Sequence, residues 1–402
     1  MTTLFSQRVS RYQIPGIVVT VVAIAAGRLR GAFDRVPPDP GIDFYLESRR
    51  DGLSTLFREE GGYLDVPRRA LSQVVSLAST EYWVIASNLL WLGLIAICSV
   101  AIYTTVLSAS FSRLTSFGAA LTYVLSPAMS ESQLGHESVV KWTLLLILAI
   151  LLAREATIQL PSKWLLLLIT ICCLSNPVAF SLIPIFLISR FKEIKRRDPR
   201  AWAILSAFLL PLSLQFIVWL RSGQSIQKYG GDTIYLPWDG IGFFWIFNWM
   251  LVPLLAPPLL GVEYLLRNHF QADKSKTLSS YRVNLLVASI LVWTVSYAIG
   301  GIADRYFVVP QTLLWISAIL LITDLRDFRF KVLAQNLVGV GVSLLLLLGA
   351  AQWFTASAFL SASQRWSSDI AEAKVVCLGE DQSTVSIPQS LNEIEIDCSL
   401  LN

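Results

Sequence analysis

The sequence predicts an all-α integral membrane protein with about eleven transmembrane helices. Three observations lead to this fold class. Hydrophobic residues make up 54% of the 402 residues and charged residues only 15%, which is outside the usual range of soluble domains. The apolar residues gather in long runs, and the basic residues gather in a few loops between these runs. Helices are the open-chain elements that satisfy their own backbone hydrogen bonds in lipid.

About ten apolar runs are candidate membrane-crossing helices. They cover residues 14–27, 83–108, 114–129, 139–153, 164–189, 201–220, 241–264, 283–300, 307–323 and 332–352. The first run is predicted to be a signal anchor, because no small-residue cleavage site follows it. The run at 164–189 contains Asn176 and Pro177, and proline disfavours helix at the residue before it. We therefore expect this run to split into two helices, with one long kinked helix as the alternative.

Basic loops predict the orientation of the helices. Positive residues favour the cytoplasmic side, so we place the N-terminus and three basic loops there and the acidic C-terminal tail outside. The basic markers are Arg8, Arg11 and the loops 190–200, 267–282 and 324–331. An odd number of crossings satisfies all these markers. We expect a multi-pass domain over residues 1–352 in the inner (plasma) membrane, with a cytoplasmic N-terminus and an extracytoplasmic tail over residues 353–402.

The loop at 28–82 is expected to lie outside and to contain short amphipathic helices on the membrane surface. Its segment "EEGGYLDVPRRALSQVV", residues 59–75, has two glycines that break one helix from the next and Pro67 near the start of the second. This segment is predicted to be a turn that presents Glu60 and Tyr63, with Arg68 on the helix that follows. A polar site on the outer face is therefore the functional hypothesis.

Four segments carry a resemblance to a known family. They are "GLSTLFREEGGYLDVPRRALSQVVSLASTEYW" (52–83), "LGHESVVKW" (134–142), "CLSNPVAFSLIPIFLISR" (173–190) and "ADRYFVVPQTLLW" (303–315). In this order they resemble bacterial polytopic membrane glycosyltransferases of the GT-C type. The resemblance implies a GT-C-like fold with an outward catalytic pocket and a polyprenyl-phosphate sugar as donor.

The implied partners are the polyprenyl-phosphate sugar, an extracytoplasmic glycan or lipid acceptor, and membrane lipids. The donor's lipid stays in the bilayer, so its phosphate needs cations at the interface, and the acceptor needs a carboxylate to take its proton. A net charge of +4 is small for this length and does not indicate a nucleic-acid partner. No glycine-rich nucleotide loop is present in the sequence, which agrees with a lipid-linked donor.

The resemblance places the catalytic carboxylate soon after the first apolar run, which makes Asp39 and Asp43 the candidates; Asp34 lies in the same segment. The family's acidic pair ahead of a glycine falls here on Pro38 to Gly41, and Asp39 is its only acid. This departure keeps open the hypothesis of a non-catalytic relative with the same fold. Any of these acids also fits a simpler role, the solvation of an exposed loop.

Arg305, with the adjacent Tyr306, is the first candidate for phosphate binding, because a guanidinium can make a two-point contact with phosphate. Snorkelling to lipid headgroups or pairing with Asp304 is the alternative. His136 and Lys141 form a second candidate substrate-binding cluster.

Glu137 and Lys141 share a helical face and could pair. The only other histidine, His269, is expected on the opposite side of the membrane, so we predict no histidine-based metal site. A divalent metal held by acids stays open.

Cys377 and Cys398 lie in the expected outside tail, among strand-like runs "AKVVCL", "STVSI" and "EIEIDC". A disulfide there would staple a small β unit, and two free thiols are the alternative. For function, the alternatives to the glycosyltransferase are a lipid-linked glycan flippase or another transporter. Transporters often have duplicated halves and charges at mid-membrane, whereas polar residues here gather at one interface.

Overall fold

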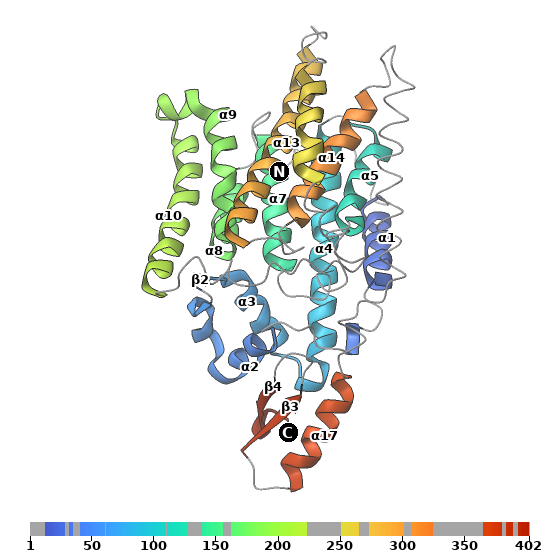
Figure 1. Cartoon of the computed structure of the whole chain (residues 1–402), viewed down its shortest axis with the longest axis vertical. Helices are drawn as coiled ribbons and strands as arrows, with labels where there is room; N and C mark the ends of the chain where they lie inside the picture. The colour runs from blue at the N-terminus through green and yellow to red at the C-terminus, as the bar shows by residue number, and fades with distance from the viewer. Residues whose placement is uncertain are drawn as a thin grey trace.

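The computed structural model describes residues 13–28, 32–34, 41–60, 62–109, 111–126, 139–155, 162–222, 251–264, 273–300, 307–324, 365–379, 383–388 and 393–401. These residues are nearly all helical, with two short antiparallel strand pairs. Figure 1 shows a bundle of helices with α2 and α3 at one end and a small C-terminal unit beyond them. The expected all-α class with a small C-terminal sheet is therefore confirmed.

Every expected apolar run that falls within the described residues forms helix. The bundle consists of α1 (Gln13–Arg28), α4 (Trp83–Ser108), α5 (Arg113–Leu125), α7 (Val139–Glu155), α8 (Ser162–Ser175), α9 (Ile183–Lys195), α10 (Pro199–Ser222), a helix over Leu251–Tyr264, α13 (Asp273–Gly300) and α14 (Val308–Asp324). Apolar side chains from most of these helices form one large core. The expected run at 332–352 lies outside the described residues.

Two helical stretches among the described residues are long and apolar enough to cross a membrane: Thr80–Ser108 and Pro199–Ser222. Four shorter apolar helices accompany them. The expectation of about eleven full-length membrane helices is therefore not met within the described residues, because many of the apolar runs form helices shorter than the roughly 20 residues that cross a bilayer core. For example, α5 has 13 residues and α8 has 14.

The run at 164–189 splits as expected. Helix α8 ends at Ser175, Asn176 is extended (φ −145°, ψ 110°), and η4 (Pro177–Leu182) leads into α9. Asn176 Oδ1 accepts a hydrogen bond from the backbone N–H of Val178 at 3.0 Å, which caps η4. The proline therefore sets the break, as its missing amide hydrogen predicts.

The loop at 28–82 contains the expected short helices and a hairpin. Its elements are η1 (Ala32–Asp34), α2 (Gly41–Asp51), η2 (Gly52–Phe57), β1 (Glu59–Glu60), β2 (Tyr63–Leu64), α3 (Val66–Val75) and η3 (Thr80–Tyr82). Gly62 has φ +87°, which closes the turn between the strands, and Pro67 lies in the first turn of α3. Phe44 and Val75 are buried, whereas Leu53 and Leu77 are exposed. One apolar face of this segment therefore packs against the protein, and other apolar side chains remain on its surface.

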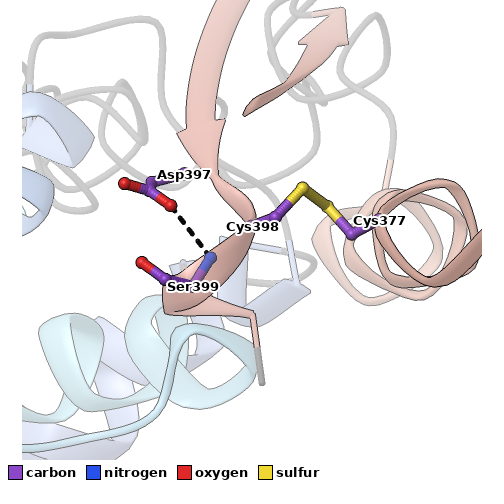
Figure 2. Close-up of a disulfide and its surroundings, with 4 residues drawn as sticks. All are labelled: Cys377, Asp397, Cys398 and Ser399. Atoms are coloured by element: carbon purple, nitrogen blue, oxygen red, sulfur yellow. Dashed lines mark hydrogen bonds between the residues drawn. A yellow bond between two sulfur atoms is a disulfide. The ribbon is translucent and has the colours of Figure 1, made fainter. Parts of the chain in front are cut away.

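The C-terminal unit consists of α17 (Trp366–Gly379), β3 (Thr384–Pro388), β4 (Glu393–Asp397) and η7 (Cys398–Leu400). Figure 2 shows the disulfide between Cys377 and Cys398, which settles the choice that the sequence left open. The two strands confirm the expectation for "STVSI" and "EIEIDC". The run "AKVVCL" is helical, so the expectation of a strand there is wrong.

Contacts of α17 and η7 attach this unit to the start of α4. The indole N–H of Trp366 donates to the carbonyl of Thr80 at 2.8 Å, and its ring meets Trp83 edge-on at 5.5 Å. The Thr80 hydroxyl donates to the Leu400 carbonyl at 2.7 Å. Asp34 accepts hydrogen bonds from the backbone N–H and the hydroxyl of Ser367, both at 2.9 Å. Asp34, one of the acids of the first loop, therefore has a structural capping role.

Candidate functional site

A cluster of ionisable side chains lies where the β1–β2 hairpin meets α7 and α8. Its members are Tyr63, Asp65, Arg68 and Lys141, which we call the hairpin cluster. The ammonium group of Lys141 donates to the Tyr63 hydroxyl at 3.0 Å. Asp65 is 1% exposed and Arg68 is 4% exposed, whereas Tyr63 and Lys141 are partly exposed. The cluster thus reaches the surface through Tyr63 and Lys141.

Gln215 of α10 holds the hairpin in place. Its side chain accepts from the backbone N–H of Leu64 at 2.7 Å and donates to the Leu64 carbonyl at 2.8 Å. The same amide also donates to the carbonyl of Cys173 at 3.1 Å. This side chain therefore replaces the strand that β2 lacks on that edge, and joins the hairpin to α8 and α10.

Asp65 is fixed from α8. The Ser175 hydroxyl donates to Asp65 Oδ1 at 3.0 Å, while Oδ2 is buried and has no hydrogen-bond partner. Burial raises the pKa of the Asp65 carboxyl above its ordinary value, against the opposing charges of Lys141 and Arg68 and the hydrogen bond from Ser175. The carboxyl therefore holds a proton more readily than an exposed aspartate does.

Helix α2 packs on the arginines of α3. The guanidinium of Arg68 lies 4.2 Å from the ring centroid of Phe44, and that of Arg69 lies 4.4 Å from it. Arg69 also pairs with Glu47 at 2.7 Å. Asp43 precedes Phe44 and is exposed in the first turn of α2. The packing of α2 on α3 therefore fixes the helix that carries Asp43 beside the helix that carries Arg68.

The structure brings together part of the expected site. Tyr63, Arg68 and Lys141 meet in the hairpin cluster, and Asp43 lies on the neighbouring α2. Glu60 lies in β1, with its side chain outside the described part of the chain. The other candidates, which are Asp39, His136, Arg305 and Tyr306, also lie outside the described residues, as does Glu137, the expected partner of Lys141.

Sequence reasoning missed Asp65, which is the most buried acid of the cluster. Its place in "GYLDVPRR" between Leu64 and Val66 was the available signal, because an acid flanked by apolar residues at the start of an amphipathic helix is surrounded by side chains that pack. Gln215 was missed as well, and the available signal was an amide side chain within the apolar run at 201–220.

Two further observations concern ions. Among the described residues, no group of three or more His, Cys, Asp or Glu side chains is arranged to hold a metal. Glu263 and Arg282 form a buried ion pair away from the hairpin cluster, in which the side chains are 1% and 3% exposed and Arg282 contacts both carboxylate oxygens. This pair joins the helix over Leu251–Tyr264 to α13.

No protein-family model, curated protein or solved structure matches the chain. The chemistry of the site therefore has to be argued from its own residues. The hairpin cluster offers two cations for an anion, a phenol for a hydroxyl-rich group and a buried carboxyl for a proton.

Proposed function

We propose that the protein is a membrane glycosyltransferase that moves a sugar from a polyprenyl-phosphate donor to an extracytoplasmic glycan or lipid acceptor. The hairpin cluster is the observation that carries this proposal. It contains two cations that both act on Asp65, Lys141 in the first turn of α7 and Arg68 on α3. Figure 1 shows α3 at the end of the bundle where the amphipathic segment lies. A phosphate that stays at the membrane interface requires such cations.

The apolar surfaces support a membrane location. Helix α10 has exposed Leu210 (72%), Phe216 (57%) and Leu220 (59%), and such a helix surface suits lipid better than water. Leu53 and Leu77 of the loop segment are also exposed, at 72% and 86%. In the proposal α4 and α10 cross the bilayer, and the loop segment lies in the outer interface.

In the proposed reaction, the acceptor hydroxyl attacks the anomeric carbon of the sugar. The bond between that carbon and the phosphate oxygen breaks, the polyprenyl phosphate leaves with the electron pair, and a carboxylate takes the hydroxyl proton. Asp43 and Asp39 are the proposed carboxylates, and attack opposite the phosphate inverts the anomeric centre. Lys141 and Arg68, with Arg305 and Tyr306, hold the phosphate, and Tyr63 covers the sugar.

The test is glycan analysis of a deletion strain complemented with variants. Wild type restores the missing glycan, whereas Lys141→Met and Asp43→Asn are expected to restore less than about a tenth of it, because loss of one electrostatic contact at a reacting group commonly costs about a hundredfold in rate. Lys192→Met, at an exposed lysine in the last turn of α9, is the matched control and is expected to restore it fully. Full restoration by both site variants at equal protein levels contradicts the proposal.

The buried Glu263–Arg282 pair favours a second candidate function, transport of a lipid-linked glycan. Charges buried between helices mark substrate or ion pathways in many transporters. In this case the deletion strain accumulates lipid-linked glycan on the cytoplasmic side, and Glu263→Gln fails to correct it. A deletion strain that lacks the glycosidic bond itself contradicts transport and supports the transferase.

A further inference from the structure

The hairpin cluster already contains an anion of its own. Asp65 attracts both Lys141 and Arg68, and these two cations repel each other. A carboxylate that attracts two cations occupies the electrostatic role that a bound phosphate would have. The cluster without substrate therefore contains its own counter-ion, which offsets one of its two positive charges.

We propose that Asp65 is the internal counter-ion that the phosphate of the donor replaces at Lys141 and Arg68, and that Asp65 takes up one proton when the phosphate binds. This inference rests on the proposed function and adds a regulatory step to the same site. The exchange balances, since one negative charge enters with the phosphodiester and one proton enters at the carboxylate.

Solvent exposure gives the direction of the exchange. Lys141 and Tyr63 are partly exposed, while Asp65 lies beneath them at 1% exposure. A phosphate that arrives from the surface meets the ammonium group first. Asp65 is held from behind by Ser175 through Oδ1, so it stays in the cluster instead of leaving with solvent.

The unpaired oxygen identifies where the proton goes. Oδ2 of Asp65 is buried and makes no hydrogen bond, and it is therefore the atom available to carry a proton. Two like charges close together in a buried site raise the pKa of the carboxyl, so the arrival of phosphate favours protonation. Burial already raises the pKa of Asp65 in the structure, which makes the step easier.

Several elements pack around Asp65, and each of them contributes a polar or charged group. They are Lys141 from α7, Arg68 from α3, Tyr63 from β2 and the neutral Ser175 from α8; α10 contributes the neutral Gln215, which binds the adjoining Leu64. Within this set, Asp65 is the group that changes charge between acidic and neutral pH. The affinity for phosphate is therefore expected to fall as pH rises and Asp65 ionises.

The experiment measures binding of undecaprenyl methyl phosphate to the full chain in lipid nanodiscs between about pH 5 and about pH 8. This probe is a phosphodiester, so its charge stays constant over that range. For wild type, Kd is expected to increase by up to about tenfold per pH unit above the pKa of Asp65, as the exchange of one proton requires. Calorimetry in buffers of different ionisation enthalpy is expected to show uptake of close to one proton.

Asp65→Asn is expected to bind tightly at all these pH values and to take up no such proton. Asp51→Asn, a partly exposed carboxylate of α2 paired with Arg50 and Arg58, is the matched control and keeps the wild-type profile. Ser175→Ala provides a second arm, since loss of its hydrogen bond raises the pKa of Asp65 further and shifts the whole profile to higher pH. Melting temperatures show that each variant is folded.

The outcomes separate this inference from the proposed function. Wild type and Asp65→Asn with the same pH profile overturn the counter-ion inference alone, and so does binding by wild type without proton uptake. A folded wild-type protein that binds no phosphodiester overturns the proposed function and this inference with it. If His136 titrates in this range, it affects wild type and Asp65→Asn equally, so the difference between their pH profiles of Kd stays the same.

Discussion

Gln215 and Leu64 lie 151 residues apart and share a two-way hydrogen bond, in which the side-chain amide of Gln215 pairs with both the N–H and the carbonyl of Leu64. This is the geometry of one rung of a β-ladder, supplied by a side chain. It ties the hairpin cluster to α10, which is one of the two stretches, among the described residues, that are long and apolar enough to cross a membrane.

Gln215→Met is expected to lower the free energy of unfolding by about 2–6 kcal/mol, because it leaves two buried backbone groups of Leu64 unsatisfied at about 1–3 kcal/mol each. Methionine has nearly the same length as glutamine, so packing changes little. Chemical denaturation in detergent measures the effect. Phe216→Leu, at an exposed position of the same helix, is the control. Equal stability of both variants would mean that the Gln215 bonds contribute nothing net.

Asp65 makes stability depend on pH. Because its folded pKa is raised, the folded protein binds this proton more tightly than the unfolded chain does. The contribution of Asp65 to the free energy of unfolding is therefore largest below the pKa of the unfolded chain and falls as pH rises towards the folded pKa. Denaturation of wild type and Asp65→Asn between about pH 4 and about pH 8 is expected to give curves that diverge as pH rises, with the variant more stable at neutral pH. Parallel curves would show that Asp65 has its ordinary pKa.

Glu263 and Arg282 are expected to be strongly coupled. Loss of one partner leaves the other charge buried and unpaired, so Glu263→Gln or Arg282→Met is each expected to cost about 3–5 kcal/mol. The double variant is expected to cost less than the sum, since no buried charge is left. A double-mutant cycle by thermal or chemical unfolding measures this coupling. Additive effects would show that the two side chains do not interact in solution.

The disulfide between Cys377 and Cys398 is expected to stabilise the C-terminal unit by about 3 kcal/mol, since it closes a loop with a sequence separation of 21. Replacement of both cysteines by serine is expected to expose the bond after Lys374 to limited trypsin digestion. Cys98→Ser, at a buried free cysteine of α4, is the control for a thiol lost elsewhere. Unchanged digestion of the double variant would mean that packing alone holds the unit together.

Local signals predicted much of the secondary structure. The pair Asn176-Pro177 marked the break between α8 and η4, and Pro67 marked the start of α3, because each acts on its own backbone. The strand expected at "AKVVCL" failed for a non-local reason. Asp34 caps the start of helix α17 by accepting from Ser367, which lies 333 residues later in the sequence. Trp366 at the same end of the helix donates a hydrogen bond to Thr80.

The sequence predicted the kinds of side chain in the candidate site, but it did not predict every residue that belongs to the site. Tyr63, Arg68 and Lys141 were expected, since charged and aromatic residues near an interface are visible in the sequence. Asp65 was not, because its hydrogen-bond partner Ser175 lies 110 residues further along the chain. Long-range packing of this kind selects one acid among several that look alike in the sequence.

The hydrogen bond from Thr80 to Leu400 joins positions 320 residues apart and closes the chain on itself. During synthesis, the ring of Trp83, which also contacts Tyr45, can be covered only after Trp366 has been added to the chain. Chains truncated before Trp366 are expected to leave this aromatic surface uncovered, because they lack the indole that packs on Trp83 and donates to Thr80.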